Sequence, residues 1–241
     1  MSLRKAGKLM KACQKSMIEA FHDEAENLER VLTTFTRAEW DLPTRCEPWT
    51  VRDLVGHLTV VLSWLPAMLT DSAPPRAEVS AADYYRPDDR FSPRTDGVRV
   101  ALARAKAAAH SDPAVLVEDF AATWRLAHLL CSAEPAPRVV RTRHGDAMLL
   151  ADFLLTRLVE LCLHGLDLAD ALSRPPWPTP YAARAVEHLL LDGAARPLGW
   201  DRPAFLRKAT GRLPLTPDET RALTDQGVTW LTLGRPRETR P

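Results

Sequence analysis

Apolar residues dominate the segment 149–172, LLADFLLTRLVELCLHGLDLADAL, and leave only a narrow polar stripe. The stripe is made of residues spaced three, four and three apart, namely Arg157, Glu160, His164 and Asp167. At about 3.6 residues per turn, this spacing puts them on one helix face, with Glu160 and His164 one turn apart. A helix that is apolar nearly all round normally lies in the centre of a bundle. The pattern therefore predicts a central helix over 149–172 with one polar face.

Similar apolar spacing predicts helices elsewhere in the chain. These helices are expected at about 16–36, 51–70, 97–110, 113–131 and 180–194. Pro66 is expected to kink the second of them or to mark its last turn. The proline-rich, charged stretch 71–95 predicts a long surface loop of the kind that borders a site. A short extended piece with a turn is expected over 138–146 and a strand over 228–234, which leaves a mainly α protein.

The helix that begins near residue 51 carries a histidine on its apolar face. Thr50 and Asp53 form a capping signal at its start, and the helical spacing then turns His57 inward. A lone inward histidine is more often a core residue than a ligand. Buried polar groups need partners, however, and a metal bound by His57, Glu160 and His164 would satisfy all three side chains. The alternative is that the polar stripe of 149–172 simply faces solvent.

The composition narrows the class of protein. A chain of 241 residues with 46% hydrophobic residues is expected to form one large domain, or one domain with a small appendage. The net charge of +1 gives no field that would recruit nucleic acid or an anionic membrane. No uncharged apolar run of about eighteen residues is present, so no membrane span is expected. The four cysteines form no CxxC motif, which indicates reduced thiols and a cytoplasmic location.

Residues 1–17 form a basic N-terminal extension with no acidic residue. Its basic residues are Arg4, Lys5, Lys8, Lys11 and Lys15. No apolar stretch of the secretory type follows them. Three interpretations stay open: a solvated extension of the first helix, an upstream start codon ahead of Met17, and a contact with nucleic acid or lipid.

Two separated motifs resemble one known family. The run 46–58, CEPWTVRDLVGHL, is followed at the matching distance by 145–169, which contains RLVE and HGLDLA. In this order and spacing they resemble the mycothiol-dependent maleylpyruvate isomerase family, whose members are DinB-like metal-binding four-helix bundles. The resemblance implies such a bundle over 18–174 and a small C-terminal α/β appendage over 175–241.

The resemblance also implies a cofactor and a chemistry. It implies zinc held by His57, Glu160 and His164, with one position open to water or a thiol, and mycothiol as the thiol cosubstrate. A thiol that coordinates zinc loses its proton, and the thiolate is the reactive nucleophile. The expected activity is S-transfer to a small electrophile, or its thiol-assisted isomerisation.

The resemblance also bears on four other positions. Arg212 stands at the family's Gly-Arg position and is the candidate catalytic residue that holds a substrate carboxylate. Asp167 is expected to support the ligand set, and Arg157 to pair with a neighbouring carboxylate. Leu166 stands where the family usually has tryptophan, so the resemblance does not fix the substrate of this chain.

Two alternatives to an enzyme remain. The first is a non-catalytic metal-binding bundle, acting as a regulator or partner-binding module, with His144, His128 or Cys46 as a fourth ligand. The second has no metal and makes the stripe a buried ion-pair network, in which Arg157 pairs with Glu160 and Asp167 with His164. The chain is expected to be a monomer or a homodimer.

Overall fold

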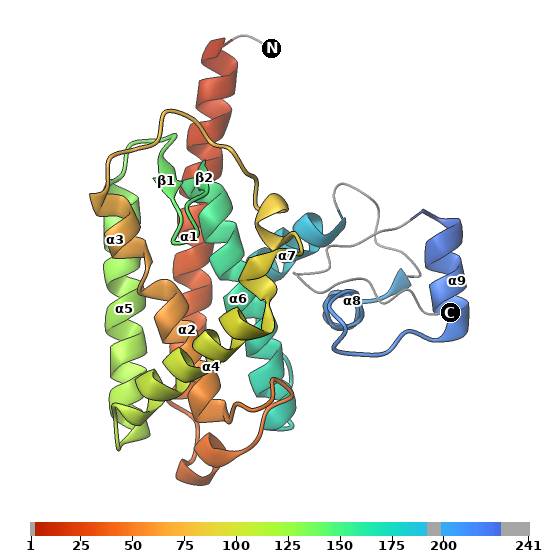
Figure 1. The fold of residues 1–241 in the computed structure, drawn as a ribbon. Helices are drawn as coiled ribbons and strands as arrows, with labels where there is room; N and C mark the ends of the chain where they lie inside the picture. Colours follow the sequence, from red (N-terminus) through yellow and green to blue (C-terminus); the bar gives the residue numbers. More distant parts are fainter. Residues whose placement is uncertain (1–2, 192–198, 228–241) are drawn as a thin grey trace.

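Four upright helices form the body of the molecule, as the computed structural model shows for residues 3–191 and 199–227 (Figure 1). They are α1 (Leu3–Leu32), α2 (Val51–Leu62), α5 (Pro113–Ala133) and α6 (Leu150–Ala171). Both α1 and α2 pack against α5 and against α6, so the four helices close into a bundle around one apolar core. The predicted mainly α bundle is confirmed.

Helix α6 lies in the centre of this bundle. Sixteen of its 22 residues are buried, among them Arg157 and Asp167 from the polar stripe. The side chains of Glu160 and His164 are only 21% and 15% exposed. The stripe is therefore not a solvent face, because its side chains point into the protein between neighbouring helices.

Helix α1 differs from the predicted 16–36 at both ends. It starts at Leu3, so the basic N-terminal segment continues the first helix, and residues 8–13 are exposed where α1 projects past the bundle (Figure 1). It ends at Leu32, because the hydroxyl groups of Thr33 and Thr34 bond to the carbonyls of Arg30 and Val31 in the last turn. Phe35 still packs against the core from the following loop.

The predicted helix 51–70 is broken into α2 and α3 (Leu65–Thr70). Pro66 lies at the start of α3, and it has no N–H to pair with the carbonyl of Leu62. The combined stretch Val51–Thr70 is long and apolar enough to cross a membrane by composition, but 61% of that window is buried inside the molecule. One such stretch is weak evidence for a span, because a core helix has the same composition.

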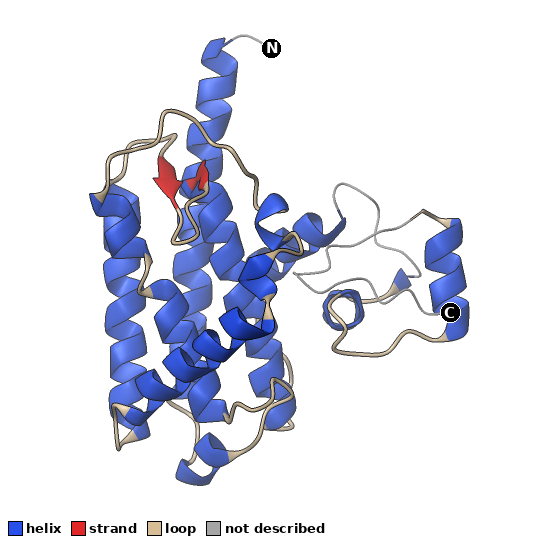
Figure 2. Cartoon of the chain, viewed as in Figure 1, coloured by secondary structure: helices blue, strands red, loops and turns tan. Residues whose placement is uncertain are grey.

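Short elements cover the side of the bundle that holds the polar stripe. Helix α4 (Pro93–Ala108) crosses α2 diagonally, preceded by the 3₁₀ turns η2 (Asp83–Tyr85) and η3 (Asp89–Phe91). A two-stranded antiparallel hairpin of β1 (Val139–Arg141) and β2 (Ala147–Leu149) leads into α6 (Figure 2).

The C-terminal region adds three helices within the described residues. They are α7 (Pro180–Leu191), α8 (Arg202–Ala209) and α9 (Pro217–Asp225). Helix α7 packs against α6 and α1, and α8 packs against α7. The strand expected over 228–234 lies outside the described residues.

Candidate metal centre

His57 enters the site from the second turn of α2. The helix starts at a capping box, in which the Thr50 hydroxyl accepts from the Asp53 N–H and the Asp53 carboxylate accepts from the Thr50 N–H. This start fixes the phase of α2 and turns His57 inward, where its side chain is 3% exposed. The indole of Trp49 stacks on the imidazole at a centroid distance of 4.7 Å and an interplanar angle of 27°. The ring of His57 is thus held in one orientation.

Glu160 and His164 meet His57 from one face of α6. The Nε2 atom of His57 lies 3.1 Å from Glu160 Oε2, and the Nε2 atom of His164 lies 3.3 Å from the same oxygen. Donors about 2.0–2.1 Å from a tetrahedral zinc are separated from one another by about 3.3 Å. Both distances to Glu160 match this spacing, and the ligand atoms of all three side chains lie within 4.8 Å of one another. Imidazole nitrogen and carboxylate oxygen are donors that zinc accepts.

The protonation states of these groups follow from their burial and contacts. Burial lowers the pKa of His57 to about 4, so its imidazole is neutral at physiological pH. Burial alone would raise the pKa of Glu160, but hydrogen bonds from His164 and His57 and the charge of Arg157 hold it well below its usual value. For His164, burial is outweighed by hydrogen bonds to Asp167, Cys46 and Glu160, which raise its pKa well above the usual value. A metal would therefore bind an ionised carboxylate and replace a proton on His164.

Asp167 supports His164 from behind. Its carboxylate is completely buried, and Oδ2 lies 2.9 Å from Nδ1 of His164. An imidazole that donates from Nδ1 presents its Nε2 lone pair on the opposite side, toward Glu160 and His57. Hydrogen bonds with His164 and Arg212 keep the pKa of Asp167 far below its usual value despite its burial.

Arg212 reaches the site from the C-terminal region. Its Nε and one terminal nitrogen donate to the two oxygens of Asp167 at 2.8 and 2.7 Å. The sequence predicted that Arg212 would hold a substrate carboxylate, whereas the structure places it on a carboxylate of the protein itself.

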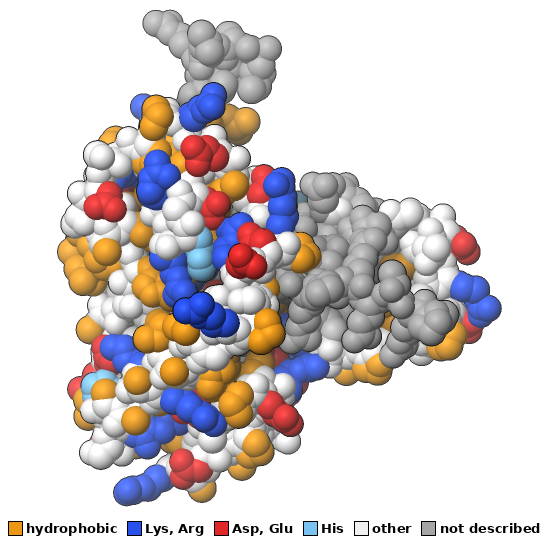
Figure 3. Space-filling model, viewed as in Figure 1, with side chains coloured by type: hydrophobic (Ala, Val, Ile, Leu, Met, Phe, Trp, Pro, Cys, Tyr) orange, Lys and Arg blue, Asp and Glu red, His pale blue; other side chains and the backbone are white. Residues whose placement is uncertain are grey.

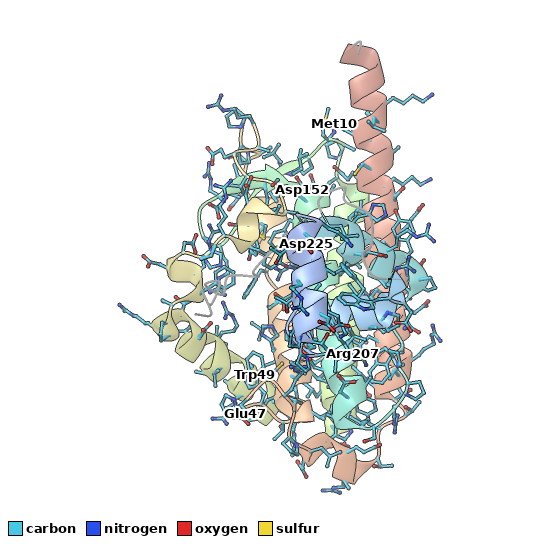
Figure 4. All side chains as sticks on the ribbon, turned by 90° about the vertical axis from the view of Figure 1, so that its right-hand side faces the viewer. Met10, Glu47, Trp49, Asp152, Arg207 and Asp225 are labelled. Atoms are coloured by element: carbon cyan, nitrogen blue, oxygen red, sulfur yellow. The ribbon has the colours of Figure 1, made fainter. Side chains whose placement is uncertain are left out.

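The loop between η1 (Arg37–Asp41) and α2 brings Cys46 to the site, next to Trp49, which stacks on His57. Both the N–H and the hydroxyl of Thr44 donate to the carbonyl of Trp49, at 3.0 and 2.8 Å, and this pair closes the loop. Glu47 and Trp49 lie together on this loop in the lower part of the molecule (Figure 4). Cys46 lies 3.2 Å from Asp167 Oδ2 and 3.8 Å from His164 Nδ1. Cys46 was named from the sequence as a possible fourth ligand, and the structure places its thiol beside Asp167 and His164, behind the donor set.

Cys46, His164 and Asp167 also converge closely enough to hold a metal. Arg212 already occupies both oxygens of Asp167, and the Arg45 guanidinium lies 3.8 Å from the same carboxylate. Two guanidinium groups beside the carboxylate oppose a second cation there. The set of His57, Glu160 and His164 is the better metal site.

Arg157 was expected to pair with a neighbouring carboxylate, but the structure shows other partners. In the described part of the chain its guanidinium contacts no carboxylate at ion-pair distance, but donates to the carbonyl of Val61 and the hydroxyl of Thr156. It is 1% exposed and packs over the rings of Trp64 and Phe153. Arg157 therefore adds positive charge behind Glu160 and joins α6 to the end of α2.

Among the described residues, none of the three candidate fourth ligands joins the set of His57, Glu160 and His164. Cys46 lies on the Nδ1 side of His164, opposite the atom that faces Glu160. His128 packs against His22 on α5 and α1, and His144 packs beside Tyr84. Within residues 3–191 and 199–227, the clusters that converge on Glu160 include only His57 and His164.

The surface outside the centre carries mixed charges. Figure 3 shows basic and acidic side chains interspersed over the face that is drawn, with no broad patch of one sign. This distribution agrees with the net charge of +1.

Comparison with known proteins places the chain in a family. Residues 21–169 match the family model described as the mycothiol maleylpyruvate isomerase N-terminal domain. The chain belongs to this family. The matched segment contains all three convergent donors and Asp167, whereas Arg212 lies beyond it. A comparison with curated proteins found no match.

Two solved structures share the fold of this maleylpyruvate isomerase family member. One is a mycothiol-dependent maleylpyruvate isomerase, 16% identical, with a TM-score of 0.53. The other is a histidine-to-alanine mutant described under the same enzyme name, 15% identical, with a TM-score of 0.56. Each match covers 93% of this chain and 95% of the other, so the likeness includes the C-terminal region as well as the bundle.

Proposed function

We propose that the protein is an enzyme that uses a divalent metal, best fitted by zinc, to activate a low-molecular-weight thiol against a small electrophile. Family membership favours mycothiol as the thiol and isomerisation as the reaction, with S-transfer as the variant in which the thiol stays attached. The convergence of His57, Glu160 and His164 from two helices carries the proposal.

The three donors fit a metal in chemistry as well as in spacing. His57 is neutral and fixed by Trp49, and Glu160 is ionised. His164 directs Nε2 into the site because Nδ1 is bonded to Asp167. Without a metal, an apolar bundle would hold these groups together only through the costly burial of charge.

The number of convergent donors favours an enzyme over a structural metal site. Structural zinc sites are closed by four protein ligands, while catalytic sites keep one position for water or substrate. The described residues bring three donors together, and Cys46, His128 and His144 lie elsewhere. When bound, such a metal supplies a positive centre that lowers the pKa of a coordinating thiol.

The protein's own residues would then orient and shield the reactants. Helix α6 and the Trp49 indole exclude water from the inner side of the site. Against the effect of burial, hydrogen bonds from His164 and His57 and the buried charge of Arg157 hold the pKa of Glu160 well below its usual value, so the carboxylate is ionised. Addition of a thiolate to an electron-poor alkene, rotation about the resulting single bond and departure of the thiolate would give isomerisation with the thiol regenerated.

Elemental analysis of tag-free protein tests the metal. We expect about one divalent metal per chain in the wild type, and less than about a tenth of that in His57→Ala and in His164→Ala. His188→Ala, which changes an exposed histidine of α7, is the matched control and should keep the metal. Absence of metal from the wild type after zinc is supplied and excess removed would overturn the proposal.

The thiol reaction needs a separate assay. Purified mycothiol with maleylpyruvate should give a changed ultraviolet spectrum at constant thiol concentration if the enzyme isomerises, and loss of free thiol if it transfers. A metal-loaded protein that changes neither with a panel of activated alkenes would favour the non-catalytic metal-binding module.

A further inference from the structure

We propose that Arg45 is a positioning residue of the metal centre, acting through Arg212 and Asp167 on His164. This inference rests on the proposed metal site, and it assigns a role to a residue that touches none of the three donors. Arg45 lies in the loop before α2, next to Cys46.

The first link of this chain of contacts is the buried pair of Asp167 and His164. The carboxylate has no exposed surface, and its Oδ2 lies 2.9 Å from Nδ1 of the imidazole. The direction of this hydrogen bond decides which ring nitrogen faces Glu160. The orientation of the His164 ring therefore depends on how firmly the Asp167 carboxylate is held in place.

The second link crosses from the bundle to the C-terminal region. Arg212 grips both oxygens of Asp167, at 2.8 and 2.7 Å, in the fork geometry that fixes a carboxylate in its plane. Helix α8 ends at Ala209, and Gly211 then makes a tight turn with a φ of +71°. This turn brings the next residue, Arg212, back toward α6.

The third link is Arg45 itself. One of its terminal nitrogens donates to the carbonyl of Gly211 at 3.1 Å and the other donates to the carbonyl of Arg212. The same guanidinium lies 3.8 Å from Oδ1 of Asp167. One side chain therefore clamps the backbone of the turn while its charge faces the carboxylate that Arg212 holds.

This arrangement makes the C-terminal region part of the metal centre. The three donors, Asp167 and Arg45 all lie in the segment that matches the family model, but Arg212, which holds both oxygens of Asp167, lies outside it. The planar fork of an arginine reaches two successive carbonyls at once, and a lysine ammonium cannot reproduce that geometry.

Metal affinity in the full chain tests the inference. We expect Arg45→Ala to weaken zinc binding about tenfold in competition with a chromophoric chelator, the lower end of the range for partners of metal ligands. Arg104→Ala is the matched control, because Arg104 also donates to a carbonyl of this loop, that of Pro48, but does not touch the turn of Gly211 and Arg212. Its affinity should stay within about twofold of the wild type.

A double-mutant cycle shows whether Arg45 acts through Arg212. In the Arg212→Ala background, Arg45→Ala should change the zinc affinity by less than about twofold, because the side chain that it positions is gone. If Arg45→Ala weakened zinc binding equally in the wild-type and Arg212→Ala backgrounds, the proposed route through Arg212 would be overturned. If Arg45→Ala alone bound zinc with wild-type affinity, Arg45 would have no positioning role.

Ring-nitrogen NMR of zinc-loaded protein gives a readout that loss of stability would not move. The His164 signals should show one bound Nε2 and one protonated Nδ1 in the wild type, with a weakened Nδ1 hydrogen bond in Arg45→Ala and the wild-type signature in Arg104→Ala. Failure of the wild type to bind zinc would count against the proposed function. Zinc binding by the wild type with an unchanged affinity in Arg45→Ala would count against this inference alone.

Discussion

The guanidinium of Arg157, in the middle of α6, donates to the backbone carbonyl of Val61, in the last turn of α2, across 3.2 Å. The contact lies where the Pro66 break separates α2 from α3. A charged side chain thus ties two bundle helices together at a point where the backbone ladder is interrupted.

Replacing this arginine should cost stability. We expect Arg157→Met to lower the free energy of unfolding by about 2–4 kcal/mol, because buried hydrogen bonds to a charged group are lost and the Val61 carbonyl loses its side-chain donor. Urea denaturation followed by circular dichroism measures the change. Arg94→Met, at an exposed position of α4, should stay within about 0.5 kcal/mol of the wild type. A loss no larger than that of the control would show that the contact is not stabilising.

Asp167 should matter for the metal more than for the fold. We expect Asp167→Asn to weaken zinc affinity by about 10–100-fold, because the amide loses the charge that holds Arg212 and can turn its NH₂ toward His164. Chelator competition provides the measurement. Asp170→Asn is the comparison on the same helix, since Asp170 pairs with Arg207 and is 39% exposed. Equal affinities in the two variants would contradict the role of Asp167.

The buried carboxyl of Glu24 should make the stability of the protein depend on pH. This carboxyl is 1% exposed in α1 and accepts from the Thr179 N–H at 2.7 Å, and burial raises its pKa. A group with a raised folded-state pKa contributes stability below its unfolded pKa and loses it as the pH rises through the folded value.

The variant Glu24→Gln keeps an acceptor for Thr179 without the ionisation. Its free energy of unfolding relative to the wild type should therefore rise from about pH 4 upward and level off above the folded-state pKa. Thermal unfolding across this range tests the sign. A difference between the two proteins that is constant with pH would show that Glu24 does not titrate differently in the folded state.

Gly56 allows a close approach between α2 and α4. A Cβ at this position would lie 2.5 Å from the carbonyl oxygen of Ala103, and a backbone atom cannot move aside cheaply. Gly56→Ala should cost about 1–3 kcal/mol of unfolding free energy. Gly97→Ala is the counterpart within α4, where a Cβ meets nothing within 4 Å. It should stabilise by about 0.5–1 kcal/mol through helix propensity, and calorimetry of both variants should give opposite shifts in Tm.

Local sequence pattern located the four bundle helices and nominated the three residues that converge. The predicted helix 149–172 differs from α6 by one residue at each end, because its apolar periodicity is strong throughout. His57 was placed inward by the capping signal and the phase of α2. Donors that lie on two well-formed helices could thus be nominated before their distance was known.

Contacts between distant segments escaped the same reasoning. Nothing near Arg157 in the sequence marks the carbonyl of Val61 as its partner, so an ion pair with a nearby carboxylate was expected instead. Arg212 was singled out, but its partner Asp167 lies 45 positions away, and Arg45 lies farther still from the turn that it clamps. Such partners are set by how loops and the C-terminal region fold back, which helical periodicity does not encode.

The turn after α8 also bears on how this protein can be recombined. A chimera that joins residues 1–174 to the C-terminal region of another family member would fold its bundle around all three donors, yet it would inherit a foreign partner for Asp167. Metal binding by such a chimera would then depend on whether the new C-terminal region supplies an arginine that Arg45 can hold against Asp167.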